Sequence, residues 1–504
     1  MPRISTLICL LASALLPLHA NAATADTTTP NEDLTGFPPC DALIHAGLRD
    51  RLLPPTSPSY EARIETWWAL NTRLRPWCLI QPHTTAEVST ALTALLNTST
   101  NTTTEYSAGA GDWHIAIRAG GHSANPRANN IDAGVTIDLG ALNATTYDSD
   151  TNVASIGPGG RWKDVYAVLR ERWGVAVAGG RDGGVGVGGF LLGGGLTYFM
   201  GRRGFACDAV RGFEVVLANG SIVEATRDNG HGDLWRALKG GGGQFGVVTR
   251  FDVEAVPDAD LAYGIRFMDA AAHAPALVDV LVDFTDRYEE GSGDALVAFL
   301  MYNISVNAGA PVAAAIHVNT DGDGDSPSFA GLNRIPSLQP DSTRAMPLAS
   351  AAEESRLSSG TWNAGATLSF KNDARILSHA LALHSQLTAS LSATLGASTF
   401  QSTVFLQPLP AFLGAISART GGNVLGLGSS HHQQQQTRNA IIWTGAVAVT
   451  TGPRDLAVAR TALMATAREL RDFAEGLGGG DGPNDEYVGH VEFPVGQTNS
   501  VELL

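Results

Sequence analysis

The stretch VAVAGGRDGGVGVGGFLLGGGLTYFMGRRGFACDAV, residues 175–210, has the densest glycine pattern in the chain. Gly184, Gly186 and Gly189 satisfy the G-x-G-x-x-G spacing that follows a strand in dinucleotide-binding folds. In those folds the motif opens a helix, but here the glycines at 193–195 follow at once, and each glycine costs a helix about 1 kcal/mol. The pattern therefore favours an extended loop around a flat or charged ligand over a Rossmann helix.

Glycine-rich loops of this kind suit an anionic ligand. Backbone N–H groups that carry no side chain can approach a pyrophosphate closely, and successive N–H groups form an anion-binding concavity. The alternative is that the glycines only make tight turns. Because glycines are dense in two separate segments, we favour the ligand-binding interpretation.

Local signals outside this stretch predict alternating strands and helices. CLIQP at 78–82 and WHIAIRAGG at 113–121 have the pattern of strands, and the amphipathic residues 84–97 between them predict a helix opened by a threonine cap. Together they form a β-α-β unit. The Asn219-Gly220 pair predicts a β-hairpin, and the glycine density drops after Pro257, where we place a domain boundary.

The rest of the chain predicts a second domain of mixed structure. Strands such as ALVAFLMYNISV, 295–306, alternate with helices such as the long segment 453–477. SSHHQQQQTRN, 429–439, is either a histidine-based metal loop or a polar surface loop; we favour the surface loop and predict no metal site. The predicted divisions are 1–22, a signal peptide; 23–75, an N-terminal tether with a helical piece, 59–74; 76–257 and 258–480, the two domains; and 481–504, a tail.

The net charge and the N-terminal sequence indicate which partners and which compartment to expect. With 33 Lys+Arg against 49 Asp+Glu, a net charge of −16 and no basic run, we expect no nucleic-acid partner. Residues 1–22 combine a short basic start, a short apolar run and an Ala-Asn-Ala cleavage site, which predicts a secretory signal peptide and no membrane span. A buried N-terminal helix is the alternative, disfavoured by the polar stretch that follows. No protein partner is evident.

If the protein is secreted, its cysteines can form a disulfide, because disulfides persist in oxidising compartments. Outside the signal peptide the chain has Cys40, Cys78 and Cys207. We expect Cys40 and Cys78 to be bridged, which stabilises by roughly 3–4 kcal/mol, and Cys207 to be buried and free. Sequons predict glycosylation of a subset of Asn97, Asn101, Asn143, Asn219 and Asn303.

Six motifs in order resemble a known family. They are RAGGHS (118–123), NIDAGVTIDL (130–139), SIGPGGRWKDVY (155–166), VGVGGFLLGGG (185–195), GRRGFACDAV (201–210) and DLWRALKGGGGQFGVVTRF (233–251). Together they resemble the berberine bridge enzyme-like FAD-linked oxidoreductases of the vanillyl-alcohol oxidase superfamily. The resemblance implies an α+β fold: a two-part FAD-binding domain of the p-cresol methylhydroxylase type, and an antiparallel-sheet substrate domain covered by helices.

The resemblance also implies a set of cofactor-binding residues. In the family, the histidine after Arg-x-Gly-Gly is bonded through its ring to the 8α carbon of the flavin, and His122 occupies that place. Many relatives have a second bond to a cysteine where this chain has Asp182, so we expect a single attachment. The implied FAD contacts are Arg118, Gly120, Gly121, His122, Ser123, Gly157, Gly159, Gly160, Val185, Gly186, Gly188, Gly189, Gly193, Gly194, Gly195, Gly246, Val247 and Val248.

The resemblance implies an oxidase that moves hydride from a small alcohol, amine or secondary-metabolite intermediate to FAD, with molecular oxygen as acceptor, and the signal-peptide pattern predicts that it is secreted. A carbohydrate oxidase and a catalytically silent scaffold are the alternatives. Relatives place a Tyr, Glu or Asp of the second domain's sheet over the flavin, and Tyr302, Tyr487 and Glu492 are the candidates for the base. The tail EYVGHVEFPVGQTNSVELL lacks the Tyr-x-Asn-Tyr-x-Asp type motif of relatives, which predicts incomplete FAD binding and little turnover.

Overall fold

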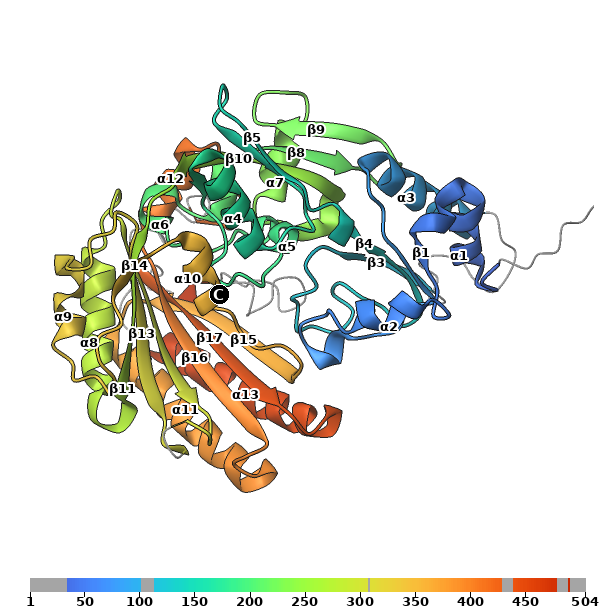
Figure 1. The fold of residues 1–504 in the computed structure, drawn as a ribbon. Helices are drawn as coiled ribbons and strands as arrows, with labels where there is room; N and C mark the ends of the chain where they lie inside the picture. The colour runs from blue at the N-terminus through green and yellow to red at the C-terminus, as the bar shows by residue number, and fades with distance from the viewer. Residues whose placement is uncertain (1–33, 101–112, 307–308, 428–437, 478–487, 490–504) are drawn as a thin grey trace, which may run out of the picture.

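The computed structural model describes residues 34–100, 113–306, 309–427, 438–477 and 488–489, and these residues form three β-sheets with helices around them (Figure 1). The first two sheets come from the N-terminal half of the chain and the third from the C-terminal half. β10 ends at Pro257 and β11 begins at Leu261, so the predicted boundary after residue 257 falls in the connection between the second and third sheets.

The first sheet is built around a β-α-β unit. Its order is β1-β2-β4-β3, and β2 and β3 both pair in parallel with β4. The elements are α1 (Pro38–Leu43), β1 (Leu52–Leu53), α2 (Pro58–Ile64), β2 (Cys78–Ile80), α3 (Thr85–Thr100), β3 (His114–Arg118) and β4 (Gly134–Asp138). The predicted helix over 84–97 is confirmed as α3, which the Thr84 side chain caps by accepting a hydrogen bond from the Glu87 amide.

The N-terminal segment is part of this sheet's packing. The predicted disulfide between Cys40 and Cys78 is confirmed and joins α1 to β2, whereas Cys207 is buried and free. The helix predicted over 59–74 ends at Ile64, because the chain then turns to bury the rings of Trp67 and Trp68.

The second sheet has six strands in the order β5-β6-β10-β8-β9, with β7 also paired to β10. They are β5 (Thr145–Asp148), β6 (Val153–Ile156), β7 (Val175–Val177), β8 (Val210–Val216), β9 (Ile222–Thr226) and β10 (Val247–Pro257). The hairpin predicted at Asn219-Gly220 is confirmed: β8 and β9 pair antiparallel, and Gly220 has φ +82°, a value that favours glycine.

Four helices lie between the strands of the second sheet in sequence: α4 (Trp162–Trp173), α5 (Val187–Leu192), α6 (Met200–Arg203) and α7 (Gly232–Leu238). Helix α5 corrects the sequence interpretation, which expected only extended loop there. Its Val187, Phe190 and Leu191 side chains are buried, and that burial outweighs the helix cost of Gly188 and Gly189 in so short a helix.

The third sheet has eight strands, all antiparallel, in the order β14-β11-β13-β12-β16-β17-β15-β18. Its elements are β11 (Leu261–Asp269), α8 (Ala270–Arg287), β12 (Asp294–Tyr302), β13 (Val312–Asn319), α9 (Ala330–Asn333), β14 (Arg344–Met346), α10 (Leu348–Glu354), β15 (Trp362–Lys371), α11 (Ala374–Leu395), β16 (Phe400–Leu409), α12 (Leu413–Arg419), β17 (Ala440–Val449), α13 (Pro453–Gly476) and β18 (Val488–Gly489). Helices α8, α11 and α13 cover the face turned away from the other two sheets (Figure 1).

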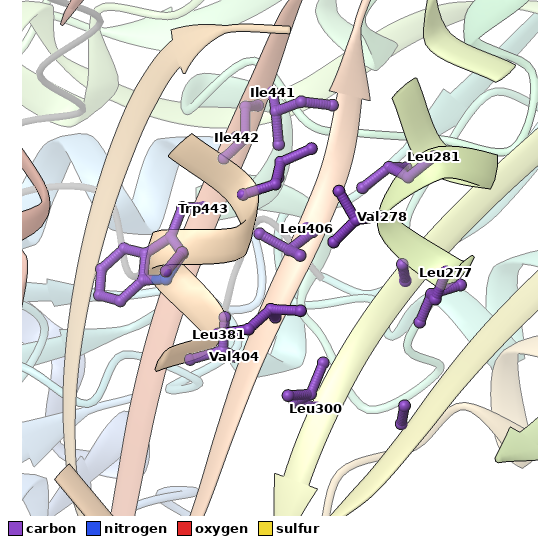
Figure 2. Packing of buried hydrophobic residues seen from close by; sticks show 14 of the residues in the cluster. Leu277, Val278, Leu281, Leu300, Leu381, Val404, Leu406, Ile441, Ile442 and Trp443 are labelled. Atoms are coloured by element: carbon purple, nitrogen blue, oxygen red, sulfur yellow. The ribbon is translucent and has the colours of Figure 1, made fainter. Parts of the chain in front are cut away.

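The largest hydrophobic core lies between this sheet and its helices. Figure 2 shows Leu277, Val278 and Leu281 of α8 and Leu381 of α11 packed with Leu300, Leu406 and Trp443 of the central strands. The α+β fold class and the antiparallel sheet covered by helices are confirmed. In the part of the chain that the structure describes, no helix combines the length and apolar composition needed to cross a membrane.

Candidate functional site

Two glycine-rich loops cross in direct contact beside the first sheet. One follows β3 and carries Gly120; the other precedes α5 and carries Gly186. A Cβ atom on Gly120 would lie 2.5 Å from the Cα of Gly186, and one on Gly186 would lie 2.4 Å from the Cα of Gly120. Because real Cβ atoms essentially never come this close, the crossing requires glycine on both loops.

A cavity of about 340 Å³ lies at this crossing, within the range of ligand-binding sites. Backbone and small side chains form much of its lining, so a ligand there can reach main-chain N–H groups. The predicted cofactor residues that line it are Gly120, Gly121, Ser123, Gly186, Gly188, Gly189, Gly193, Gly246, Val247 and Val248.

The cavity also has lining residues that the sequence interpretation missed. Gly242, Gly243 and Gln244 contribute from the turn before β10, and Arg127 and Asn129 from the loop after β3. The run of four glycines at 240–243 was a usable signal for the first group. Arg127 brings a guanidinium to the cavity wall; it also pairs with Asp132, 3.3 Å away.

Several predicted cofactor residues do not line the cavity and instead hold its walls together. Cβ atoms on Gly157 and Gly159 would lie 2.2 and 2.3 Å from the carbonyl oxygens of Leu142 and Leu139. Because glycine has no Cβ atom, the turn after β6 can pack directly on the backbone that follows β4. Outside the cavity lining lie Gly157, Gly159, Gly160, Val185, Gly194, Gly195, Arg118 and His122.

Arg118, one of the implied FAD contacts, is not part of the cavity lining and makes its contacts elsewhere. Its Nη2 donates to the Thr66 hydroxyl oxygen at 2.7 Å, its Nη1 lies 3.5 Å from the Asp138 carboxylate, and its guanidinium carbon lies 3.6 Å from the centre of the Trp67 ring. Burial is the main influence on this guanidinium and lowers the pKa of Arg118 to about 9. The side chain therefore joins the N-terminal segment to the first sheet.

His122 is buried with one ring nitrogen that has no partner. The side chain is 4% exposed, its ring stacks on Trp68 with centroids 4.9 Å apart, and its Nδ1 makes no hydrogen bond to the protein. Burial, and then the charges of Arg161 and Arg356, lower the pKa of His122 to about 3. The imidazole is therefore neutral near pH 7 and keeps a nitrogen lone pair that can form a bond.

Asp182 faces His122 from the loop before α5. Its Oδ2 lies 4.0 Å from Nε2 of His122 and accepts a hydrogen bond from the Leu357 amide at 2.9 Å. Its Oδ1 accepts from the Gly184 amide at 2.6 Å. Burial raises the pKa of Asp182, and the backbone amides and Arg356 oppose that effect. Two amide donors thus hold the carboxylate in place beside the imidazole.

Tyr302 lies on the wrong face of the third sheet for the predicted catalytic base. Its hydroxyl is 3.1 Å from the Ser392 hydroxyl on α11, and its ring stacks on Phe400 in the helix-covered core. The structure therefore favours a packing role for Tyr302. The two other candidates, Tyr487 and Glu492, lie outside the described residues, as does most of the low-complexity insert.

The opposite face of the central strands meets the loop before α5, since Arg181 of that loop donates a hydrogen bond to Gln407 of β16. Side chains alternate along a strand, so the register identifies the positions on this face. Among the described residues of β12, β15, β16 and β17, none of these positions is Asp, Glu or Tyr. The positions are Ala295, Val297, Phe299, Met301, Asn363, Gly365, Thr367, Ser369, Lys371, Gln401, Thr403, Phe405, Gln407, Leu409, Ala440, Ile442, Thr444, Ala446 and Ala448.

This face does carry buried polar atoms without protein partners: Gln407 Nε2, Thr367 Oγ1 and Thr444 Oγ1. Thr367 and Thr444 are cross-strand neighbours. Buried polar groups are nearly always hydrogen-bonded, so these atoms are available to a bound molecule. What the described face offers is hydrogen bonding by an amide and hydroxyls.

Comparison with known proteins gives a consistent result. A family model described as an FAD binding domain matches residues 76–226. The chain is 33% identical to the FAD-dependent monooxygenase drtC of Aspergillus calidoustus over 389 residues, 77% of this chain and 72% of that relative. It is 31% identical to the FAD-dependent monooxygenase sdcF of Emericella nidulans, over 77% of this chain and 78% of the relative.

Solved structures share the fold at low sequence identity. Berberine bridge enzyme from Eschscholzia californica aligns with a TM-score of 0.64 and 14% identity, over 86% of this chain and 84% of that one. The 6-hydroxy-D-nicotine oxidase from Arthrobacter nicotinovorans aligns with a TM-score of 0.62 and 19% identity, over 82% of this chain and 86% of the other.

Proposed function

This chain belongs to the berberine bridge enzyme-like FAD-linked oxidoreductases, and from that membership we propose that it is a secreted oxidase of a small alcohol, amine or secondary-metabolite intermediate, with molecular oxygen as electron acceptor. FAD supplies the hydride acceptor for such a reaction. The protein binds the cofactor, orients the substrate and excludes water. Secretion rests on the signal-peptide pattern of residues 1–22 and is tested by locating the protein in the culture medium.

The observation that carries the proposal is the glycine crossing beside the cavity, with a buried imidazole nearby. The crossing brings two loops of backbone N–H groups to one cavity, which suits a pyrophosphate. The unpartnered Nδ1 of His122 suits a bond to carbon, because no hydrogen bond has to be broken first. These features fit a flavin dinucleotide attached at one residue.

We propose that the attachment is through His122 alone, and its test is direct. Acid-precipitated wild-type protein is expected to stay yellow, whereas His122→Ala is expected to bind FAD that acid releases. Gly230→Ala is a matched control, because a methyl group there meets no atom within 4 Å. A colourless wild-type pellet with all flavin in the supernatant would contradict the linkage and leave the family membership intact.

A second candidate function comes from the relatives drtC and sdcF, which are named FAD-dependent monooxygenases. An oxidase returns one hydrogen peroxide per oxygen consumed and places no oxygen atom in its product. A monooxygenase places one atom of O2 in the product and needs two further electrons. Turnover in ¹⁸O2 separates the two: unlabelled product with stoichiometric peroxide supports the oxidase, and labelled product supports the monooxygenase.

The substrate-facing side of the third sheet guides the substrate panel. Gln407, Thr367 and Thr444 have buried polar atoms without protein partners there, so we expect a substrate with groups that can hydrogen-bond to an amide and to hydroxyls. Phenolic alcohols, amines and oligosaccharides are compared by anaerobic bleaching of the flavin absorbance. Bleaching by oligosaccharides alone would favour the carbohydrate oxidase alternative.

A further inference from the structure

Asp182 is the residue whose placement the proposed function leaves unexplained. It is 1% exposed, and burying a carboxylate is costly unless the charge has a use or a partner. Its Oδ2 is 4.0 Å from Nε2 of His122, too long for a hydrogen bond but close enough for a strong charge interaction. The amides of Gly184 and Leu357 prevent the carboxylate from rotating away.

The surroundings of the imidazole otherwise oppose a positive charge. Arg161 and Arg356 are the two charged groups that lower the pKa of His122, in addition to burial. Arg161 precedes α4 and Arg356 follows α10, so cationic groups approach the ring from two elements. Asp182 brings a carboxylate to the ring, with Oδ2 4.0 Å from Nε2 of His122, and Glu353 of α10 adds negative potential at Asp182.

Attachment of a flavin creates such a positive charge. The bond forms between Nδ1 of the neutral imidazole and the 8α methyl carbon of the flavin. That carbon loses one proton, and two electrons and one proton enter the ring system, so the flavin becomes reduced and the imidazole becomes an imidazolium with its proton on Nε2. Dioxygen then takes two electrons and two protons to give hydrogen peroxide and the oxidised, attached flavin. Nε2 is the atom that faces Asp182.

We propose that Asp182 is a positioning residue for flavin attachment: it orients the Nε2–H side of His122 toward itself, leaves Nδ1 free for the bond, and offsets the charge that develops on the ring. This proposal rests on the proposed linkage at His122. Burial raises the pKa of Asp182, which makes its carboxylate a better acceptor for the Nε2 proton. Asp182, which stands where many relatives have a second flavin-bonded cysteine, thus assists attachment at His122.

The test measures binding and attachment separately in the full chain. Protein carrying unattached FAD is incubated with excess FAD in air, total flavin is measured by absorbance, and attached flavin is measured in acid-precipitated protein over time. Asp182→Asn removes the charge at nearly constant size; we expect total flavin close to wild type and attachment at least tenfold slower. Asp182→Glu restores a carboxylate, and we expect it to recover part of the rate.

Glu353→Gln is the matched control, because it removes one negative charge near Asp182 from an exposed position. We expect its attachment rate to equal that of wild type. Asp182→Ser, which keeps an oxygen acceptor for the Gly184 amide, replaces Asp182→Asn if the latter does not accumulate.

Attachment at the wild-type rate in the Asp182 variants would overturn the proposal while leaving the linkage intact. A parallel loss of bound and attached flavin, without recovery in Asp182→Glu, would also overturn it, because that result indicates a role in folding only. Fully bound but never attached flavin in wild type would refute the linkage and this inference together.

Discussion

Replacing Gly120 by alanine tests the crossing of the two loops. The added Cβ would lie 2.5 Å from the Cα of Gly186, and real Cβ atoms essentially never lie within 3.0 Å of another heavy atom, so the loops must separate by at least 0.5 Å (3.0 minus 2.5). The atoms of Gly186 that the Cβ would meet belong to the backbone, and they cannot rotate away as a flexible side chain can. Overpacking of this kind costs about 1–3 kcal/mol, and each kcal/mol lowers Tm by about 2–4 °C in a domain of this size.

The assay is thermal unfolding followed by circular dichroism, together with the flavin content of the purified protein. We expect Gly120→Ala to lower both, because the crossing forms a wall of the cavity. Gly230→Ala is the control: it lies outside the cavity lining, and its Cβ would meet no atom within 4 Å. A Gly120→Ala protein with wild-type Tm and flavin content would refute the argument that contact at the crossing requires glycine.

Three further predictions concern other residues. Removing the Cys40–Cys78 bridge by a double serine substitution is expected to lower the free energy of unfolding by about 4 kcal/mol for a sequence separation of 38, measured by urea denaturation against oxidised wild type. Burial lowers the pKa of His384 to about 4, below its ordinary value, so the unfolded chain binds more protons between pH 6.5 and 4 and stability falls as the pH falls; in His384→Gln this part of the Tm decrease is expected to disappear. Asp182→Cys is expected to form a second flavin bond, and peptide mapping that finds flavin on His122 alone and a free thiol at 182 would contradict the alignment of this loop.

Local patterns were enough to predict much of the fold. The helix over 84–97, the hairpin at 219–220 and the Cys40–Cys78 bridge each depend on residues whose preferences act over a short distance. The glycines that line the cavity were predicted from the ordered motifs. Such motifs indicate where two backbones must approach closely, which hydrophobic periodicity cannot indicate.

Side-chain direction was where sequence reasoning failed. Strand β12 is buried on both faces, so its residues show no apolar-polar alternation, and nothing in the sequence indicates which face Tyr302 occupies. Arg118 was predicted to contact FAD because it lies in the RAGGHS motif. The direction of its side chain depends instead on Asp138 and Trp67, which are distant in sequence. Helix α5 formed because tertiary burial overrode a poor local preference, which a glycine count alone cannot indicate.

Residues 66–72 are hydrogen-bonded both to the loop after β3 and to the C-terminal half of the chain. The Trp68 amide donates to the Gly121 carbonyl, and the Trp68 carbonyl accepts from the Gly360 amide of the C-terminal half. Asn71 exchanges hydrogen bonds with Asn363 in the same way. Yet the matched FAD-binding region starts at residue 76, downstream of all these contacts. A fragment that begins at residue 76 would lose these hydrogen bonds and one end of the Cys40–Cys78 disulfide, so we expect it to be less stable than a chain that keeps the segment upstream.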